Sequence, residues 1–375
     1  MKYALATLWH DRQRYLPGVL AVAFSAVLIA LQCGLLLGLF AITSLPIDRT
    51  SADIWVGSPQ VLSVDLGEPI PESFLSRVAA VPGVEETEFY YQAFATWTNA
   101  DGGSDKCMII GSRLEPGSMG LLDALTPELR DRLTEPNSVV IDVSDLDRLG
   151  VKGVGDTAHI NRRPVRIVGL VSGVRGLAAS YVFCSEPTAR TLLRHHLGPE
   201  RTIYILARCS SPERAEQVVR ELRAAYPDDM AVYTSREFSL RSRLHWLTKT
   251  KAGIALGYAA LLGLLVGLVV TSQTLFAATT AAAREYAILL ALGIPRWRVS
   301  MAVIAQSFWV GLAGMGTAFP AMFLIAQGAD TLGAQVRLEP WLLASTAAIT
   351  MTMAVVSGLF ALRSVRQIEP MQLLR

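Results

Sequence analysis

The residue types that could perform chemistry occur in this chain, but their spacing matches none of the common reactive sites. A phosphate-binding loop needs a lysine that follows a glycine and precedes a serine or threonine, so that backbone amides and the ammonium group hold the phosphates. The sequence also lacks GxSxG, the pattern of a common serine nucleophile. None of the five lysines follows a glycine: Lys2, Lys106, Lys152, Lys249 and Lys251. With neither pattern present, we expect a protein that is not an enzyme and that takes its energy from another polypeptide.

Histidine and cysteine form no metal-binding pattern. The five histidines have no partners at metal-ligand spacing, and no CxxC occurs. We interpret His195 and His196 as surface side chains. Cys107, Cys184 and Cys209 lie in a central polar block, where at most one disulfide can join two of the three. The sequence leaves that pairing open, and it predicts no metal and no cofactor on this chain.

One segment departs from an ordinary connector. Residues 284–298 lie between two long uncharged runs and read REYAILLALGIPRWR, with five leucine or isoleucine side chains that a polar loop would not need. The spacing predicts a helix that stops at the Gly-Ile-Pro break. Because no membrane buries its apolar face, we expect another protein to cover it. The residues assigned to this contact are Arg284, Glu285, Tyr286, Ile288, Leu289, Leu292, Gly293, Ile294 and Pro295.

The distribution of hydrophobic residues predicts the helices that position this segment. Hydrophobic residues make up 51% of the chain. They concentrate in four uncharged runs, each longer than the roughly 20 residues that cross a bilayer as a helix. The first run exceeds the roughly 7–15 apolar residues of a secretion signal, so we interpret it as a retained helix. The runs are 15–47, 252–283, 299–329 and 340–362.

Positive charge indicates the orientation. The N-terminal tail, the 284–298 connector and the tail after residue 362 together carry nine lysine or arginine residues against three acids. Such an excess is typical of cytoplasmic segments. Residues 48–251 carry 24 basic and 27 acidic residues, so they have no positive bias and are expected outside. The chain is therefore predicted to be a multi-pass protein of the cell inner membrane with both termini in the cytoplasm.

The polar block alternates strand-like and helix-like segments, which predicts an α+β domain with a core of its own. Residues 235–251 are helical in character and are expected to continue without a joint into the second span, as a stiff stalk. The first fourteen residues are expected either to lie on the cytoplasmic membrane surface before a turn at Pro17, or to extend the first span. The expected strands are 53–56, 106–110, 138–141, 165–171 and 203–206, and the expected helices are 73–80 and 212–225.

The predicted fold class is a membrane protein with four transmembrane α-helices, one plus three. A large extracytoplasmic α+β domain is inserted between the first and second helices. The expected parts are a cytoplasmic interfacial segment (1–14), the first span (15–47), the external domain (48–234), the stalk helix (235–251), the second span (252–283), the cytoplasmic connector (284–298), the third span (299–329), a short external loop (330–339), the fourth span (340–362) and a cytoplasmic tail (363–375).

Small residues in the second span are spaced for close helix packing. Gly253 and Gly257 are four positions apart, as are Gly263 and Gly267, which lets membrane helices approach closely. This face is a candidate contact with a second subunit, although each pair alone is common in membrane helices. An amide inside a span, as at Gln273, is costly to leave unpaired, so we expect it to hydrogen-bond to another helix.

The order of these parts resembles a known family. The connector REYAILLALGIPRWRV after an apolar helix, the large domain between the first and second spans, and the C-terminal IEPMQLLR are similar to permeases of the MacB/FtsX group of ABC transporters. In the external domain, VAAVPGVEE and LGVKGVGDTAHINRRPVRIVGLVSG resemble recurrent segments of that group's periplasmic core domain. Gln32, Cys33 and Gly34 late in the first span, with the chain length, are most similar to the DevC-like branch.

The resemblance implies a coupling helix at 284–295 that sits in a groove of a separate ABC ATPase, which binds the ATP and Mg. It implies a permease homodimer with two ATPases, joined in the DevC-like branch by a periplasmic adaptor and an outer-membrane channel. Movement of the external domain would then drive export or extraction of a lipid, glycolipid, peptide or lipoprotein cargo by mechanotransmission.

Two alternatives stay open at this point. One is a lipoprotein-releasing permease, and the other is an FtsX-like transmembrane signal transmitter that activates an external cell-wall hydrolase. The net charge of +2 is the cytoplasmic excess over a nearly neutral domain, so no nucleic-acid partner is expected.

Overall fold

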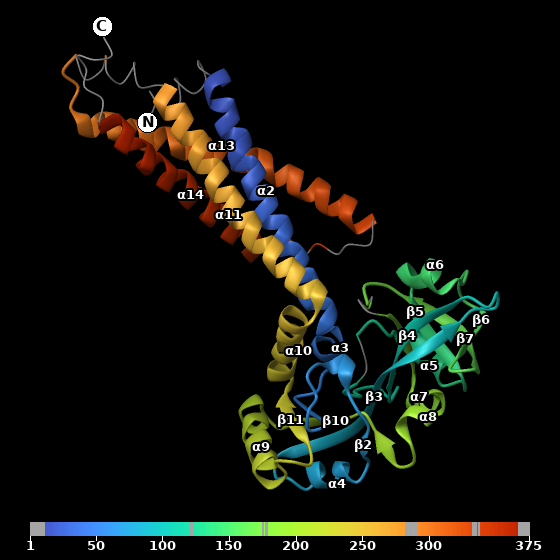
Figure 1. The fold of residues 1–375 in the computed structure, drawn as a ribbon. Helices are drawn as coiled ribbons and strands as arrows, with labels where there is room; N and C mark the ends of the chain where they lie inside the picture. The colour runs from blue at the N-terminus through green and yellow to red at the C-terminus, as the bar shows by residue number, and fades with distance from the viewer. Residues whose placement is uncertain are drawn as a thin grey trace. The chain divides into compact units, whose positions relative to one another are not determined.

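The computed structural model describes residues 12–120, 123–174, 176, 179–281, 288, 292–331, 336 and 338–366. The chain divides into two compact units, one formed by Met1–Gly38 with Lys251–Arg375 and the other by Leu39–Thr250. Long helices dominate the first unit, and the described strands all belong to the second (Figure 1).

Four long apolar helices make up the described part of the first unit. Each contains a stretch long and apolar enough to cross a bilayer. The prediction of four spans, one before and three after an inserted domain, is therefore confirmed. The helices are α2 (Arg12–Thr43), α11 (Lys251–Ala281), α13 (Arg296–Thr331) and α14 (Pro340–Arg366).

Helix α2 passes through Pro17 instead of turning there. It begins at Arg12, so the proline falls early in the helix. A proline removes one backbone hydrogen bond, and neighbouring groups in a membrane helix compensate for that loss. Of the two alternatives, the turn at Pro17 is therefore wrong, and the helix extends the first span back to Arg12. Residues 1–11 lie outside the described residues, so a surface helix there stays a prediction.

The second unit is built on one sheet, whose described strands follow the order β11-β1-β10-β3-β4-β8-β5-β7-β6. In its first part, β11, β1, β10 and β3 pair antiparallel. Helix α4 (Phe74–Ala79) connects β1 to β3, and α9 (Pro212–Ala225) connects β10 to β11. This β-α-β-β-α-β order is the ferredoxin-like topology. The strands are β1 (Ile54–Gly57), β3 (Val84–Thr98), β10 (Tyr204–Cys209) and β11 (Ala231–Thr234).

Helix α9 illustrates how local sequence forms these elements. The Ser211 hydroxyl caps its start by accepting a hydrogen bond from Arg214 N at 3.2 Å. Pro212 occupies the first turn, where an amide hydrogen has no helical partner. Apolar residues at helical spacing then form one stripe that packs in a core with α4 and the sheet. The stripe consists of Ala215, Val218, Val219 and Leu222.

The chain between β3 and β10 forms a closed ring of strands. From β3 the described pairings run through β4, β8, β5, β7 and β6, and the pairing of Trp97 with Ile160 returns from β6 to β3. Closure leaves these strands without a free edge. The strands are β4 (Ser104–Ser112), β5 (Ser138–Asp142), β6 (Thr157–Ile160), β7 (Arg163–Val171) and β8 (Ser180–Ser185).

Short elements complete this unit. They are the helices α3 (Leu45–Asp48), α5 (Pro127–Leu133), α6 (Leu146–Leu149), α7 (Glu186–Leu192) and α8 (Arg194–Leu197), the 3-10 turns η1 (Val64–Leu66) and η2 (Val143–Asp145), and the strand pair β2 (Ile70–Pro71) and β9 (Arg201–Thr202).

Strand β3 belongs to both parts of the sheet. Its first half pairs with β10 and its second half, from Tyr91, pairs with β4. Figure 1 shows it as the long strand of this unit. All five strands and both helices that the sequence predicts for the external domain are found, with ends shifted by a few residues. Strand β3 was not predicted, because the acids at its start are depleted in strands.

Helix α10 (Ser235–Lys249) contradicts the expected continuous stalk. The Thr234 hydroxyl caps its start by accepting a hydrogen bond from Glu237 N at 3.2 Å. At its end, Thr250 has an extended backbone, with φ −100° and ψ 144°, before α11 begins at Lys251. Helical residues need ψ near about −42°, so one extended residue interrupts the hydrogen-bond ladder. The two helices are therefore separated by a joint at Thr250.

Candidate functional site

The described part of the 284–298 connector contains a helix end. Leu292 N donates to Ile288 O at 3.0 Å, and Gly293 follows with φ +83°, the left-handed conformation that commonly ends helices. Arg298 N donates to Pro295 O at 2.9 Å as α13 begins. The break therefore lies at Gly293, as the sequence predicts. Four of the residues assigned to the contact lie outside the described residues: Arg284, Glu285, Tyr286 and Leu289.

The connector presents apolar side chains to solvent. Leu292 is 75% exposed and Ile288 is 43% exposed, and Pro295 is exposed as well, whereas Ile294 is half-buried. Nearby, Trp297 is exposed. Exposed apolar side chains of this kind are typical of a contact with another protein or with a membrane.

Two of the predicted packing glycines contact another helix of the same chain. A Cβ atom on Gly267 would lie 3.1 Å from Ser25 Cβ, and one on Gly263 would lie 3.4 Å from Gln32 Cγ. A side chain at Gly267 would therefore crowd α2. The sequence leaves a contact with a second subunit open for this face, and the structure shows that part of it packs within the chain.

The other predicted packing residues of α11 differ in burial. Gly253 is buried, Gly257 is half-buried and Gln273 is exposed. Among the described residues, none forms a hydrogen bond with Gln273. The expected interhelical bond of this amide is therefore not found in the part of the chain that the structure describes.

Hydroxyl groups that no sequence pattern marks connect three of the long helices. Ser25 Oγ on α2 lies 3.0 Å from Thr271 Oγ1 on α11. The next residue, Ser272, places its Oγ 2.9 Å from Ser357 Oγ on α14. Serine and threonine are common in membrane helices, so their spacing gives no signal. These bonds link α11 to two neighbouring helices.

In the second unit, four side chains connect the segment after α2 to α10. Arg243 Nη2 donates to Asp48 Oδ2 at 2.7 Å, and its Nε donates to Ser44 Oγ at 2.9 Å. Ser239 donates to the other carboxylate oxygen of Asp48 at 2.7 Å, and Ser44 donates to Oδ2 at 2.6 Å. Ser44 directly follows α2, and Asp48 ends α3. This Asp48–Arg243 cluster fastens the chain that leaves the first span to the helix that precedes the second.

All four cysteines are free. Cys107 and Cys184 lie on neighbouring strands, but the register pairs Cys107 with Ser180 and Cys184 with Gly111, so they are four positions apart. The disulfide that the sequence allows is therefore not present. Burial raises the pKa of Cys107 to about 12, and the nearby Asp105 carboxylate adds to this shift.

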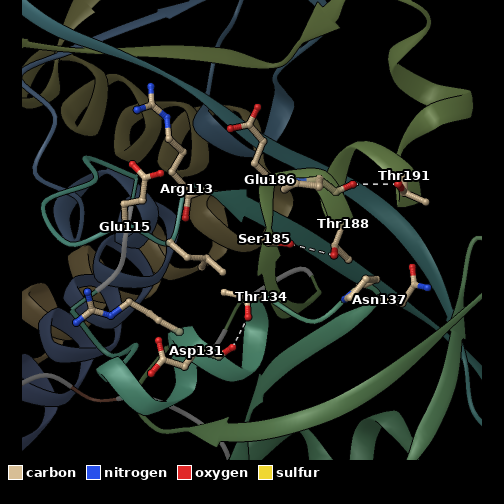
Figure 2. A pocket seen from close by; sticks show the side chains of 14 residues that line it. Arg113, Glu115, Asp131, Thr134, Asn137, Ser185, Glu186, Thr188 and Thr191 are labelled. Carbon is tan, nitrogen blue, oxygen red and sulfur yellow. Dashed lines mark hydrogen bonds between the residues drawn. The ribbon is translucent and has the colours of Figure 1, made fainter.

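A cavity of about 590 Å³ lies beside the ring of strands (Figure 2). Ser185 donates to Thr188 at 3.0 Å, and the hydroxyls of Thr134 and Thr191 donate to backbone carbonyls. Burial raises the pKa of Glu186, although Arg190 and Arg113 act in the opposite direction. No histidine or cysteine is among the described residues that line it, so it holds no evident nucleophile with its base. Its charged side chains include Arg113, Glu115, Asp131 and Glu186.

Two family profiles match the chain. Residues 19–225 match the MacB-like periplasmic core domain, and residues 257–370 match the FtsX-like permease C-terminal. The first match alone covers more than half of the chain. The chain belongs to the MacB/FtsX-type family of ABC transporter permeases. MacB/FtsX-type permeases are multi-pass membrane subunits that work with an ATPase partner in ABC transporters.

Solved structures similar to this permease share little sequence with it. The periplasmic region of MacB from Actinobacillus actinomycetemcomitans is 15% identical, with a TM-score of 0.35, over 51% of this chain and 92% of that chain. The extracellular domain of the noncanonic ABC-type transporter YknZ from Gram-positive bacteria is 13% identical, with a TM-score of 0.34, over 48% of this chain and 99% of that chain. A comparison with curated proteins found no match.

Proposed function

We propose that this MacB/FtsX-type permease is driven by a separate ABC ATPase that docks on the connector between α11 and α13. The observation that carries the proposal is the exposed apolar pair Ile288 and Leu292 at the helix end marked by Gly293. Burying a leucine-sized side chain against a partner stabilises a complex by roughly 1.5–3 kcal/mol. The proposed contact also includes Arg284, Glu285, Tyr286, Leu289, Ile294 and Pro295.

In this proposal the connector and both termini face the cytoplasm, and the four helices lie in the cell inner membrane. The excess of basic residues on these segments supports this orientation. The exposed side chains of Trp297 and Trp341, at the starts of α13 and α14, suit the two membrane–water boundaries. The second unit then lies outside the cytoplasm.

The ATPase supplies the movement and this chain transmits it. ATP and Mg are bound by the ATPase, and no cofactor is needed on the permease. A displaced connector moves α11, which is linked to α2 through Thr271 and Ser25. The Asp48–Arg243 cluster fastens the chain after α2 to α10, so movement of the first and second spans reaches the external domain through connected elements. The joint at Thr250 lets α11 tilt without forcing α10 to tilt equally.

The proposed working unit is a permease homodimer with two ATPases, of the DevC-like type, with a periplasmic adaptor and an outer-membrane channel as further partners. Its proposed action is export or extraction of a lipid, glycolipid, peptide or lipoprotein cargo on the outer side by mechanotransmission. The four uncharged runs support this, because a path for ions or protons through the spans would need charged side chains.

The test is to replace Ile288 and Leu292 with aspartate. Each change removes an apolar contact and adds a carboxylate to the contact surface, so ATPase co-purification and permease-stimulated ATP hydrolysis should fall by about tenfold or more. Val154→Asp is the matched control, because it replaces an exposed aliphatic side chain of the external domain with a carboxylate. Full binding and stimulation in the double variant would refute the coupling role.

A further inference from the structure

We propose that the external domain holds a second binding site, a groove that accepts a short basic and amphipathic peptide segment. The groove has a volume of about 820 Å³ and is formed by the segment 58–68, the middle of β3, α8 and the turn between α9 and β11. Its size falls within the range of roughly 300–1,000 Å³ that is usual for binding pockets. The defining residues of this acidic groove are Leu62, Leu66, Phe94, Asp65, Glu68 and Asp228.

The acidic groove has exposed apolar side chains on a firmly held backbone. Leu62 is 46% exposed, Leu66 is 43% exposed and Phe94 is 38% exposed. The backbone around the two leucines is tied to α10: Val64 N donates to Ser242 Oγ at 3.1 Å. Arg241 Nε, also on α10, donates to Val61 O at 3.1 Å. The backbone on both sides of Leu62 is thus fixed, while its side chain is exposed and can contact a ligand.

Carboxylates dominate the charge of the groove. Among the described residues, its lining includes three carboxylates, one imidazole, His196, and no lysine or arginine. Asp65 already accepts hydrogen bonds from Trp246 Nε1, at 3.1 Å, and from Ser63. Among the described residues, none donates a hydrogen bond to Glu68 or Asp228 or forms an ion pair with them. Two carboxylates on separate segments are therefore free to pair with a ligand.

The exposed apolar side chains and the free carboxylates of the groove together define the chemistry of the ligand. Two free carboxylates attract a ligand with two cationic groups, and the leucines and Phe94 require apolar groups beside them. A peptide in which lysine or arginine flanks leucine or phenylalanine has both features, whereas an amphiphile with a single amine would pair with only one carboxylate. The acidic groove contains none of the residues assigned to the ATPase contact, so the inference goes beyond the proposed coupling.

The test is equilibrium binding of a fluorescein-labelled Lys-Leu-Phe-Lys amide to the full chain in zwitterionic nanodiscs, with empty nanodiscs subtracted. Glu68→Gln with Asp228→Asn should raise the Kd by about tenfold, equivalent to roughly 1.4 kcal/mol. The matched control, Glu115→Gln with Asp131→Asn, neutralises two acids of the other cavity and should leave the Kd unchanged. Added salt should weaken binding to the wild type, because the paired charges are partly exposed.

Two further variants keep the test decisive if the neutralised protein fails to fold. Phe94→Ser should weaken binding without a change in charge, and Glu68→Lys with Asp228→Lys should reverse the preference toward a Glu-Leu-Phe-Glu probe. The inference is overturned if the wild type binds no more peptide than empty nanodiscs, or if the groove variants and the control bind equally well. Displacement by dodecylamine at equal concentration would also overturn it, in favour of a single-amine amphiphile. None of these measurements needs ATP or an ATPase. A negative result would therefore overturn the peptide site without affecting the coupling proposal.

Discussion

At the scale of the single residue, the buried thiol of Cys107 makes the external domain sensitive to alkali. Burial, with a contribution from Asp105, raises its pKa from 9.0 to about 12. In the unfolded chain the thiol loses its proton above about pH 9, whereas in the folded domain it keeps the proton until about pH 12. The unfolded state therefore binds fewer protons in this window, and the free energy of unfolding falls as the pH rises. Near pH 10, this thiol lowers that free energy by about 1.4 kcal/mol.

We expect Cys107→Ala to reduce the loss of stability between about pH 8 and pH 10 by roughly this amount. The measurement is urea unfolding of the full chain in detergent, with near-ultraviolet circular dichroism as the signal. Val182→Ala, which shortens a buried side chain on the neighbouring strand β8 without removing an ionisable group, is the control and should keep the wild-type dependence on pH. If Cys107→Ala shows the same dependence as the wild type, another group is responsible for alkaline unfolding.

At the scale of the element, the Asp48–Arg243 cluster is predicted to transmit movement more than to stabilise the fold. Both side chains are more than a third exposed, so their ion pair contributes at most about 1 kcal/mol. Arg243→Gln removes the charge that joins the segment after α2 to α10. We expect a spin label on Leu240→Cys, an exposed position of α10, to lose most of its ATP-dependent change in mobility in this variant.

The control for this experiment is Arg49→Gln, which breaks an exposed ion pair in the same domain, in which Arg49 Nη1 donates to both carboxylate oxygens of Asp123. It should keep the ATP-dependent change, and both variants should still bind the ATPase. An unaltered response in Arg243→Gln would remove the cluster from the proposed path of movement.

At the scale of the whole molecule, the proposed orientation predicts which positions an impermeant thiol reagent reaches. Cysteine at Asp101, on the turn between β3 and β4, should be labelled from outside the cell, and cysteine at Arg298 should be labelled only after the membrane is opened. Both side chains are exposed in the structure. Labelling of the native protein from outside should be low, because the three native cysteines of the external domain are buried. Labelling in the opposite order would reverse the topology and with it the side on which an ATPase could dock.

The membrane architecture was determined by the sequence alone. A span requires only that about 20 consecutive residues be apolar, which is a local property, so four uncharged runs were enough to predict four helices. The cap and stripe of α9 and the stop at Gly293 are also local, since the residues that form them are neighbours in the chain.

Strand β3 shows where local reasoning fails. The glutamates at its start are uncommon in strands, yet Glu88 is fully buried in this one. The carboxylate accepts hydrogen bonds from Met119 N at 2.8 Å, Arg113 N at 3.2 Å and Ser118 Oγ at 2.5 Å. A buried carboxylate is tolerated only with such partners. They come from the segment after β4, and no pattern within β3 indicates them.

Only the tertiary structure decided which distant segments meet. Asp48 and Arg243 are 195 positions apart, and Ser25 and Gly267 are 242 positions apart. The acidic groove likewise needs segments from both ends of the external domain. A bilayer acts on each apolar run separately, so each span can be predicted from its own residues. Contacts between remote side chains depend on the path of the whole chain, and the closed ring of strands and the joint at Thr250 are features of that path.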